Sequence, residues 1–221
     1  MDRFYGSFVQ RGDRVFDIGA HVGDRVASFR RLGARVVAVE PQFAMVRVLR
    51  LFYGRDADVA IEAVAVGRRV GATSMMINAD NPTVSTASRE FVSAAREAPG
   101  WEAQRWSKSV RVPVTTLDAL IGKYGAPTFI KIDVEGFEEE ALQGLTLAVK
   151  ALSFEFTIIQ RGVALACVER CLALGYTRFN AALGESQLFV NADWVGGEEI
   201  ARWLTGLPHA ANSGDIYAAL G

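Results

Sequence analysis

The sequence lacks an excess of charge of either sign. Its 221 residues include 24 basic and 25 acidic side chains, for a formal net charge of −1. A protein that binds nucleic acid through the phosphates carries a basic footprint, so we expect no nucleic-acid partner. Arg30, Arg31 and Arg35 lie close together in the chain, and we interpret them as a solvated helix end.

Long apolar runs and paired cysteines are also missing. No run reaches the roughly 18 apolar residues that a membrane-spanning helix needs, and the first residues are too polar for a signal peptide. We therefore expect a soluble, cytoplasmic protein. The two cysteines, Cys167 and Cys171, are four residues apart in a helical pattern. That spacing suits neither a disulfide nor a zinc site, so both are predicted to be core residues of a reducing compartment.

What the sequence does contain is an alternation of short apolar runs with helical segments. The predicted strands are 14–18, 35–39, 59–66, 128–133 and 151–156, and the predicted helices are 23–32, 42–53, 136–145 and 163–174. This order indicates parallel βαβ units with right-handed crossovers. We therefore predict one α/β domain over residues 1–221. Its Rossmann-like, mostly parallel seven-stranded sheet should have helices on both faces.

Two regions are less regular. About forty residues after position 66 contain β-like segments at 72–77 and 110–114 and a helix at 89–98, and their length suggests a lid or binding loop. Near the C-terminal end, residues 176–180 and 187–190 flank a turn at 183–185, which predicts an antiparallel hairpin. A last helix is expected at 193–204.

In such a sheet a ligand binds at the carboxyl ends of the strands, and the first strand runs there into Asp17-Ile18-Gly19-Ala20-His21-Val22-Gly23. Gly19 permits a tight turn, and Gly23 lets the next helix begin close to the sheet. A dinucleotide loop has a third glycine and no nearby carboxylate. Asp17 would repel a diphosphate but suits a ligand with an ammonium and a sulfonium, which favours S-adenosylmethionine.

The other strand ends agree with an adenosine ligand. Glu40, followed by Pro41, can accept hydrogen bonds from both ribose hydroxyls, and the uncharged Ala63-Val64 could lie along the adenine. Asp133 ends the fourth strand where the reactive methyl is expected, and Glu135 follows it. Two such carboxylates can orient a hydroxyl, take its proton or hold a cation.

The segments VFDIGAHVGD, VVAVEP, FIKIDVEGFEEEALQGL and FEF occur in this order between about residues 13 and 160. Together they resemble the FkbM-type methyltransferases, a class I family that uses S-adenosylmethionine and is generally associated with O-methylation of sugars and secondary metabolites. The resemblance implies that Asp17, Gly19 and Gly23 form the cofactor loop, that Glu40 binds the ribose and that Asp133 lies beside the methionine end or the reacting centre. One difference is His21, where the family usually has Asn.

The predicted reaction is an in-line attack of a hydroxyl oxygen on the sulfonium methyl, which leaves S-adenosylhomocysteine. Asp133 or Glu135 is the expected base, with Glu155 in reserve, and a divalent metal could assist but is not demanded. The acceptor would be a small molecule or glycan. Its pocket is expected near Asn81, Trp101, Trp106 and Glu185-Ser186, and a second subunit could complete it. The alternatives are a cofactor-binding protein without turnover and an NAD-linked oxidoreductase.

Overall fold

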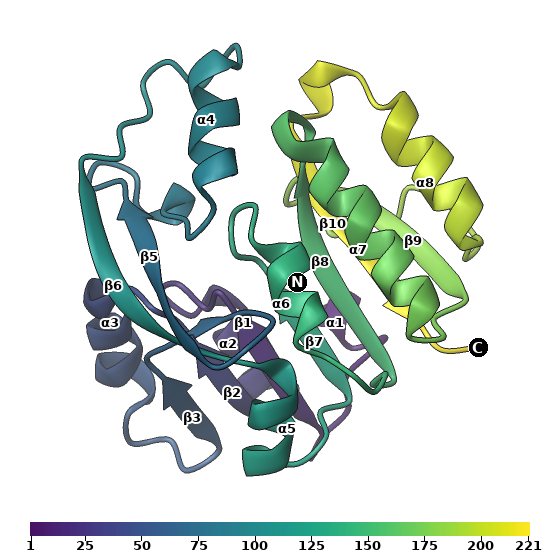
Figure 1. Ribbon diagram of the computed structural model, residues 1–221. Helices are drawn as coiled ribbons and strands as arrows, with labels where there is room; N and C mark the ends of the chain where they lie inside the picture. Colours follow the sequence, from purple (N-terminus) through teal and green to yellow (C-terminus); the bar gives the residue numbers. More distant parts are fainter.

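The strand–helix alternation forms a seven-stranded sheet with the order β3-β2-β1-β7-β8-β10-β9 in the computed structural model, which describes residues 1–221 (Figure 1). Strands β1, β2, β3, β7 and β8 run parallel, whereas β10 is antiparallel to β8 and β9. The predicted fold class is confirmed. The strands are β1 (Arg14–Ile18), β2 (Arg35–Val39), β3 (Val59–Glu62), β7 (Phe129–Ile132), β8 (Ala151–Thr157), β9 (Arg178–Leu183) and β10 (Ser213–Ala219).

Helices cover both faces of this sheet because alternate strand residues point to opposite sides. Phe16 and Ile18 of β1 face a larger core, which includes α5 (Leu117–Tyr124), α6 (Glu138–Gln143), α7 (Arg161–Ala173) and α8 (Gly197–Gly206). Val15 faces a second core under α1 (Asp2–Tyr5), α2 (Asp24–Arg31) and α3 (Phe43–Tyr53). Asp17 points to the side of Val15, so the sequence positions a carboxylate beneath α2.

The predicted third strand, 59–66, is in fact two strands in different sheets. The chain leaves the main sheet after β3, and Ala65–Val66 (β4) pairs instead with β6 (Lys108–Thr115), which also pairs with β5 (Gly71–Ile77). The region expected to be a lid or binding loop therefore contains most of a second, three-stranded sheet, together with α4 (Arg89–Glu97) and the short 3-10 helix η1 (Pro82–Val84).

The second strand of the predicted C-terminal hairpin is wrong. β9 pairs with β10, whereas residues 187–190 form no strand. Gln187 has a left-handed backbone with φ +51°, which interrupts an extended strand, although Phe189 still packs against the second core. β10 is almost entirely buried and takes the position between β8 and β9. The 3-10 helices η2 (Ile158–Gln160) and η3 (His209–Ala211) complete the elements.

The two cysteines and two of the three clustered arginines lie on helices. Cys167 and Cys171 are free and fully buried in α7, as predicted. Arg30 pairs with two aspartates and Arg31 with Asp2, so these arginines belong to ion pairs of the helix end. Helix α1 was not predicted. None of the helices combines the length and apolar character needed to cross a bilayer.

Candidate functional site

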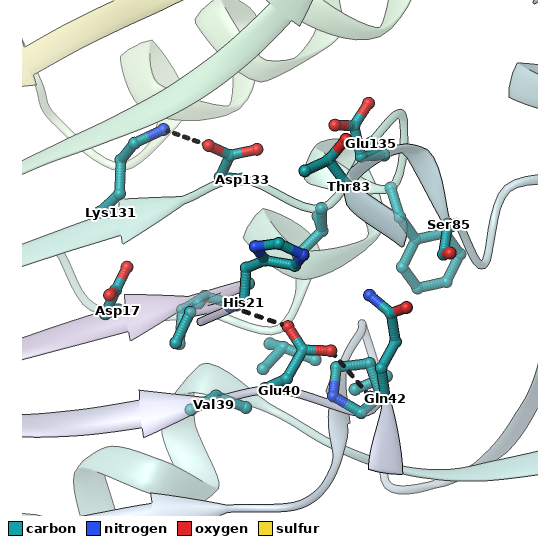
Figure 2. A pocket seen from close by; sticks show the side chains of 18 of the residues that line it. Asp17, His21, Val39, Glu40, Gln42, Thr83, Ser85, Lys131, Asp133 and Glu135 are labelled. Carbon is teal, nitrogen blue, oxygen red and sulfur yellow. Dashed lines mark hydrogen bonds and ion pairs between the residues drawn. The ribbon is translucent and has the colours of Figure 1, made fainter. Parts of the chain in front are cut away.

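A cavity of about 290 Å³ opens at the carboxyl ends of β1, β2 and β7 (Figure 2). It brings together most of the predicted site residues, namely Asp17, Gly19, Ala20, His21, Val22, Glu40, Pro41, Val64, Asp133 and Glu135. Of the predicted set, Gly23 and Ala63 do not line it. Its other walls include residues that the sequence did not single out, such as Gln42, Met75, Thr83, Ser85, Ala87 and Lys131.

The loop after β1 takes backbone conformations that need its glycines. Gly19 has φ +87°, and a Cβ at this position would lie 1.7 Å from the carbonyl oxygen of Asp133. Gly23 has φ +95°, and a Cβ there would lie 2.7 Å from the ring of Tyr53. The Tyr53 hydroxyl donates a hydrogen bond to the Gly23 carbonyl at 3.0 Å. Gly19 therefore lets the loop contact the chain at the end of β7, and Gly23 lets the start of α2 pack against α3.

Glu40 holds this loop from the end of β2. Its Oε2 accepts the His21 N–H at 3.0 Å, and its Oε1 accepts the Gln42 N–H at 2.7 Å. Burial raises the pKa of Glu40 to about 7, although both backbone hydrogen bonds oppose this shift. Each carboxylate oxygen has a second lone-pair direction, so the side chain can still accept hydrogen bonds from a ligand in the cavity.

Asp17 is 2% exposed, and its Oδ2 has no hydrogen-bond partner. Burial raises its pKa to about 7, although the charges of Arg25 and Lys131 act in the opposite direction. The buried Nε2 of His21 also lacks a partner, and burial lowers the pKa of this imidazole. A buried acceptor without a hydrogen-bond partner lowers the stability of the fold. At a cavity wall it fits a ligand that brings a donor such as an ammonium.

A buried lysine connects this site to the far end of the sheet. Lys131 of β7 is 1% exposed, and its Nζ lies 2.7 Å from Asp215 Oδ1 on β10 and 3.1 Å from Asp133 Oδ2. Tyr217 donates to the other oxygen of Asp215 at 3.2 Å. Burial lowers the pKa of Lys131, but the two aspartates outweigh it and hold that pKa well above its usual value. Lys131 is therefore a fixed positive charge behind the Asp133 carboxylate.

Three carboxylates meet where β7 and β8 end. Oxygens of Asp133, Glu135 and Glu155 lie within 4.8 Å of one another. Burial and the charge of Asp133 raise the pKa of both Glu135 and Glu155 well above their usual value. Burial also opposes ionisation of Asp133, but Lys131 and Arg25 outweigh it and lower that pKa. Hard divalent cations bind such oxygen sets, although carboxylate groups of this kind also occur without a metal.

Only part of the predicted acceptor pocket lies in this cavity. Glu185 lines the cavity, where it pairs with Arg25 at 2.5 Å. Ser186, Asn81, Trp101 and Trp106 do not line it. Trp106 donates its indole N–H to the Val84 carbonyl and packs against Phe91, so its role is structural.

The sheet order, the antiparallel last strand and the glycine loop beside two carboxylate groups define a Rossmann-like methyltransferase. A family model described as the methyltransferase FkbM domain matches residues 17–206, so this chain belongs to the FkbM methyltransferase family. It is accordingly an S-adenosylmethionine-dependent methyltransferase, as the sequence predicted. No curated protein matched the chain in a sequence comparison.

Solved structures of similar shape are distant in sequence. A precorrin-6y C5,15-methyltransferase from Geobacter metallireducens is 13% identical with a TM-score of 0.46, over 99% of this chain and 86% of that one. A putative rRNA methylase from Clostridium thermocellum is 9% identical with a TM-score of 0.48, over 100% and 93%. Fibrillarin from Aeropyrum pernix, with natively bound S-adenosyl-L-methionine, is 9% identical with a TM-score of 0.47, over 96% and 68%.

Proposed function

We propose that this protein methylates a hydroxyl oxygen on a small-molecule or glycan acceptor, such as a sugar or secondary metabolite. The observation that carries the proposal is the arrangement of the cavity. Glu40 lies at one end, Asp133 and Glu135 lie at the other, and the glycine loop runs between them. S-adenosylmethionine supplies an electrophilic methyl group on a sulfonium when it is bound.

We assign one half of the cavity to the cofactor because its acceptors and apolar surface match the groups of S-adenosylmethionine. Glu40 accepts the ribose hydroxyls with the lone pairs that His21 and Gln42 leave free. Asp17, buried and without a partner, accepts the ammonium of the methionine part. Val64 and Pro41 provide apolar surface for the base.

Asp133 and Glu135 are proposed to act on the acceptor hydroxyl. Asp133 is held by Lys131, so its carboxylate is fixed in place and can orient the hydroxyl. The Glu135 side chain has no ion pair or hydrogen bond to another residue, and its raised pKa increases its affinity for a proton. We assign the ionised form of Glu135 the removal of the hydroxyl proton, with Glu155 beside it as the alternative base. Methyl transfer needs no metal for this step, although the three carboxylates could hold one.

The charges around the cavity favour an uncharged acceptor. Both cationic side chains that line it are already paired, Lys131 with two aspartates and Arg25 with Glu185. A phosphate would therefore find no free cation there, and it would lie near the ionised Asp133. This supports a neutral polyol or sugar hydroxyl and argues against the phosphates of a nucleic acid.

The proposal is tested by offering methyl-labelled S-adenosylmethionine with a panel of sugars, polyols, hydroxylated macrocycles and an oligoribonucleotide. We expect a labelled O-methyl ether that is identified by NMR. Glu135→Gln should lower kcat by about 10²–10⁴-fold, the usual contribution of a general base. The matched control is Glu139→Gln in α6, because Glu139 does not line the cavity, and this variant should retain activity. A labelled amine or nucleobase, or full activity of Glu135→Gln, would refute the assignment.

A further inference from the structure

Helix α3 has an apolar outer face. Phe43, Leu51 and Phe52 are 71%, 79% and 69% exposed, while the inward side of the helix is formed by the buried Val46 and Leu49. At 100° per residue the exposed side chains occupy one continuous arc. Around that arc the order is Arg50, Phe43, Arg47, Leu51, Ala44, Val48 and Phe52. A helix on the surface of a globular protein normally presents polar residues there.

The charged side chains on this face are all basic. Arg47, Arg50 and Arg55 form no ion pair and no side-chain hydrogen bond, and α3 contains no acidic residue. Of the nearby acidic side chains, Glu62 pairs with Lys123, and Asp56 and Asp58 share the single cation of Arg30. The face therefore combines three large apolar side chains with three arginines that have no ion-pair partner, and the positive charge exceeds the negative charge around it.

A shallow hollow of about 520 Å³ continues the face beyond the end of α3. Its lining consists of Arg50, Gly54, Arg55, Val59 and Ile61. Two arginines above an apolar floor suit an anionic group that is attached to hydrocarbon. Figure 1 shows α3 at the periphery of the molecule. The exposed fractions of Phe43, Leu51 and Phe52 show that the rest of the chain leaves this face open.

We propose that this α3 face, made of Phe43, Arg47, Arg50, Leu51, Phe52 and Arg55, binds the surface of a membrane that contains anionic lipids. Aromatic and leucine side chains enter the interface of such a membrane, and arginines stay at the level of the phosphates. A second copy of the chain fits less well, because a twofold contact would place this all-positive patch against itself. A nucleic acid would leave Leu51 without a stacking partner, because bases stack on aromatic side chains.

Binding would place the cavity close to the lipid surface. Phe43, at the start of the face, follows Gln42, which lines the cavity and bonds to Glu40. The proposal concerns a different surface from the cavity and does not depend on which acceptor is methylated.

The test is flotation of the full chain with vesicles of phosphatidylcholine alone or mixed with phosphatidylglycerol. We expect binding to the anionic vesicles only, and weaker binding as salt rises. Arg47→Gln, Arg50→Gln and Arg55→Gln together should weaken it about 100-fold, because each arginine near an anionic surface strengthens binding about fivefold. Phe43→Ser, Leu51→Ser and Phe52→Ser together should abolish it.

Two matched controls separate this face from general surface effects. Val70→Ser, Leu147→Ser and Leu188→Ser replace residues that are 70%, 77% and 72% exposed elsewhere, and Arg96→Gln, Arg111→Gln and Arg202→Gln remove exposed charges elsewhere. Both should bind vesicles like the wild type. The proposal fails if the wild type ignores anionic vesicles, or if controls and α3 variants behave alike. It also fails if the α3 variants lose a dimer in sedimentation equilibrium, or affinity for an oligouridylate, in place of vesicle binding.

Discussion

At the residue scale, the site depends on a few positions where only one type of side chain fits. Gly19 is the clearest, because its backbone is left-handed and it lies against the Asp133 carbonyl. We predict that Gly19→Ala displaces the loop and weakens S-adenosylhomocysteine binding by about 100-fold or more, since a shift of about 1 Å in a site has effects of that size. Isothermal titration measures this directly.

Gly12 provides the matched control for that substitution. It has nearly the same backbone, with φ +88°, but a Cβ there meets nothing within 4 Å. Gly12→Ala should cost about 1–2 kcal/mol of stability through the left-handed conformation and leave cofactor affinity unchanged. Equal loss of affinity in both variants would mean that backbone strain, and not contact with Asp133, explains the effect.

Lys131 is the second such position. Lys131→Met leaves Asp215 and Asp133 without their cation, and breaking a buried pair in this way costs about 3–5 kcal/mol. We expect that loss in urea unfolding. Lys123→Met removes a lysine that is 61% exposed and pairs with Glu62, and it should leave the unfolding midpoint nearly unchanged. Equal midpoints for the two variants would contradict a structural role for the Lys131 ion pairs.

At the scale of elements, the second sheet forms one wall of the cavity. Val64, Ala65, Met75, Ser85 and Ala87 line it from this side. We predict that S-adenosylhomocysteine slows hydrogen exchange at residues 83–87 as well as at residues 19–23, because both segments lose solvent access and motion. Helix α8 lies outside the cavity and serves as the internal control. Protection of residues 19–23 alone would show that the second sheet does not contact the ligand.

Whether a feature of the fold or the site could be predicted from the sequence depends on how far apart along the chain the interacting residues lie. Asp17, Glu40 and Asp133 were predicted to lie together because the carboxyl ends of neighbouring parallel strands share one edge. The partner of Lys131 was not predictable, because Asp215 lies 84 residues away on an antiparallel strand whose place in the sheet is set by packing. For the same reason the hairpin was assigned to residues 187–190 and not to β10.

Breaks within a strand are equally hard to predict. Residues 59–66 form one continuous apolar run apart from Glu62, but β3 and β4 belong to different sheets. Glu62 and Ala63 are weak strand formers, yet no glycine or proline marks the break at Ala63-Val64. The break exists because β6, more than forty residues further along the chain, pairs with Ala65 and Val66.

For the molecule as a whole, buried carboxylates make stability depend on pH. Folding raises the pKa of Asp17 and of Glu40 to about 7, from ordinary values of about 4. The unfolded chain then holds fewer protons between these values, so the cofactor-free protein loses stability as pH rises from about 4 to about 7. Urea unfolding across this range measures the slope. Asp17→Asn with Glu40→Gln should flatten it, and an unchanged slope would mean that other groups, such as Glu138, account for it.

The central claim is that this cavity binds S-adenosylmethionine through Asp17 and Glu40. The most direct measurement is isothermal titration of S-adenosylhomocysteine into the wild type and into Asp17→Ala, with NAD as the second ligand. The control is Asp13→Ala, which removes a half-buried carboxylate that precedes β1 and does not line the cavity. We predict binding of S-adenosylhomocysteine to the wild type and the control, its loss in Asp17→Ala and no binding of NAD. Binding of NAD alone, or equal binding to all three proteins, would contradict the account.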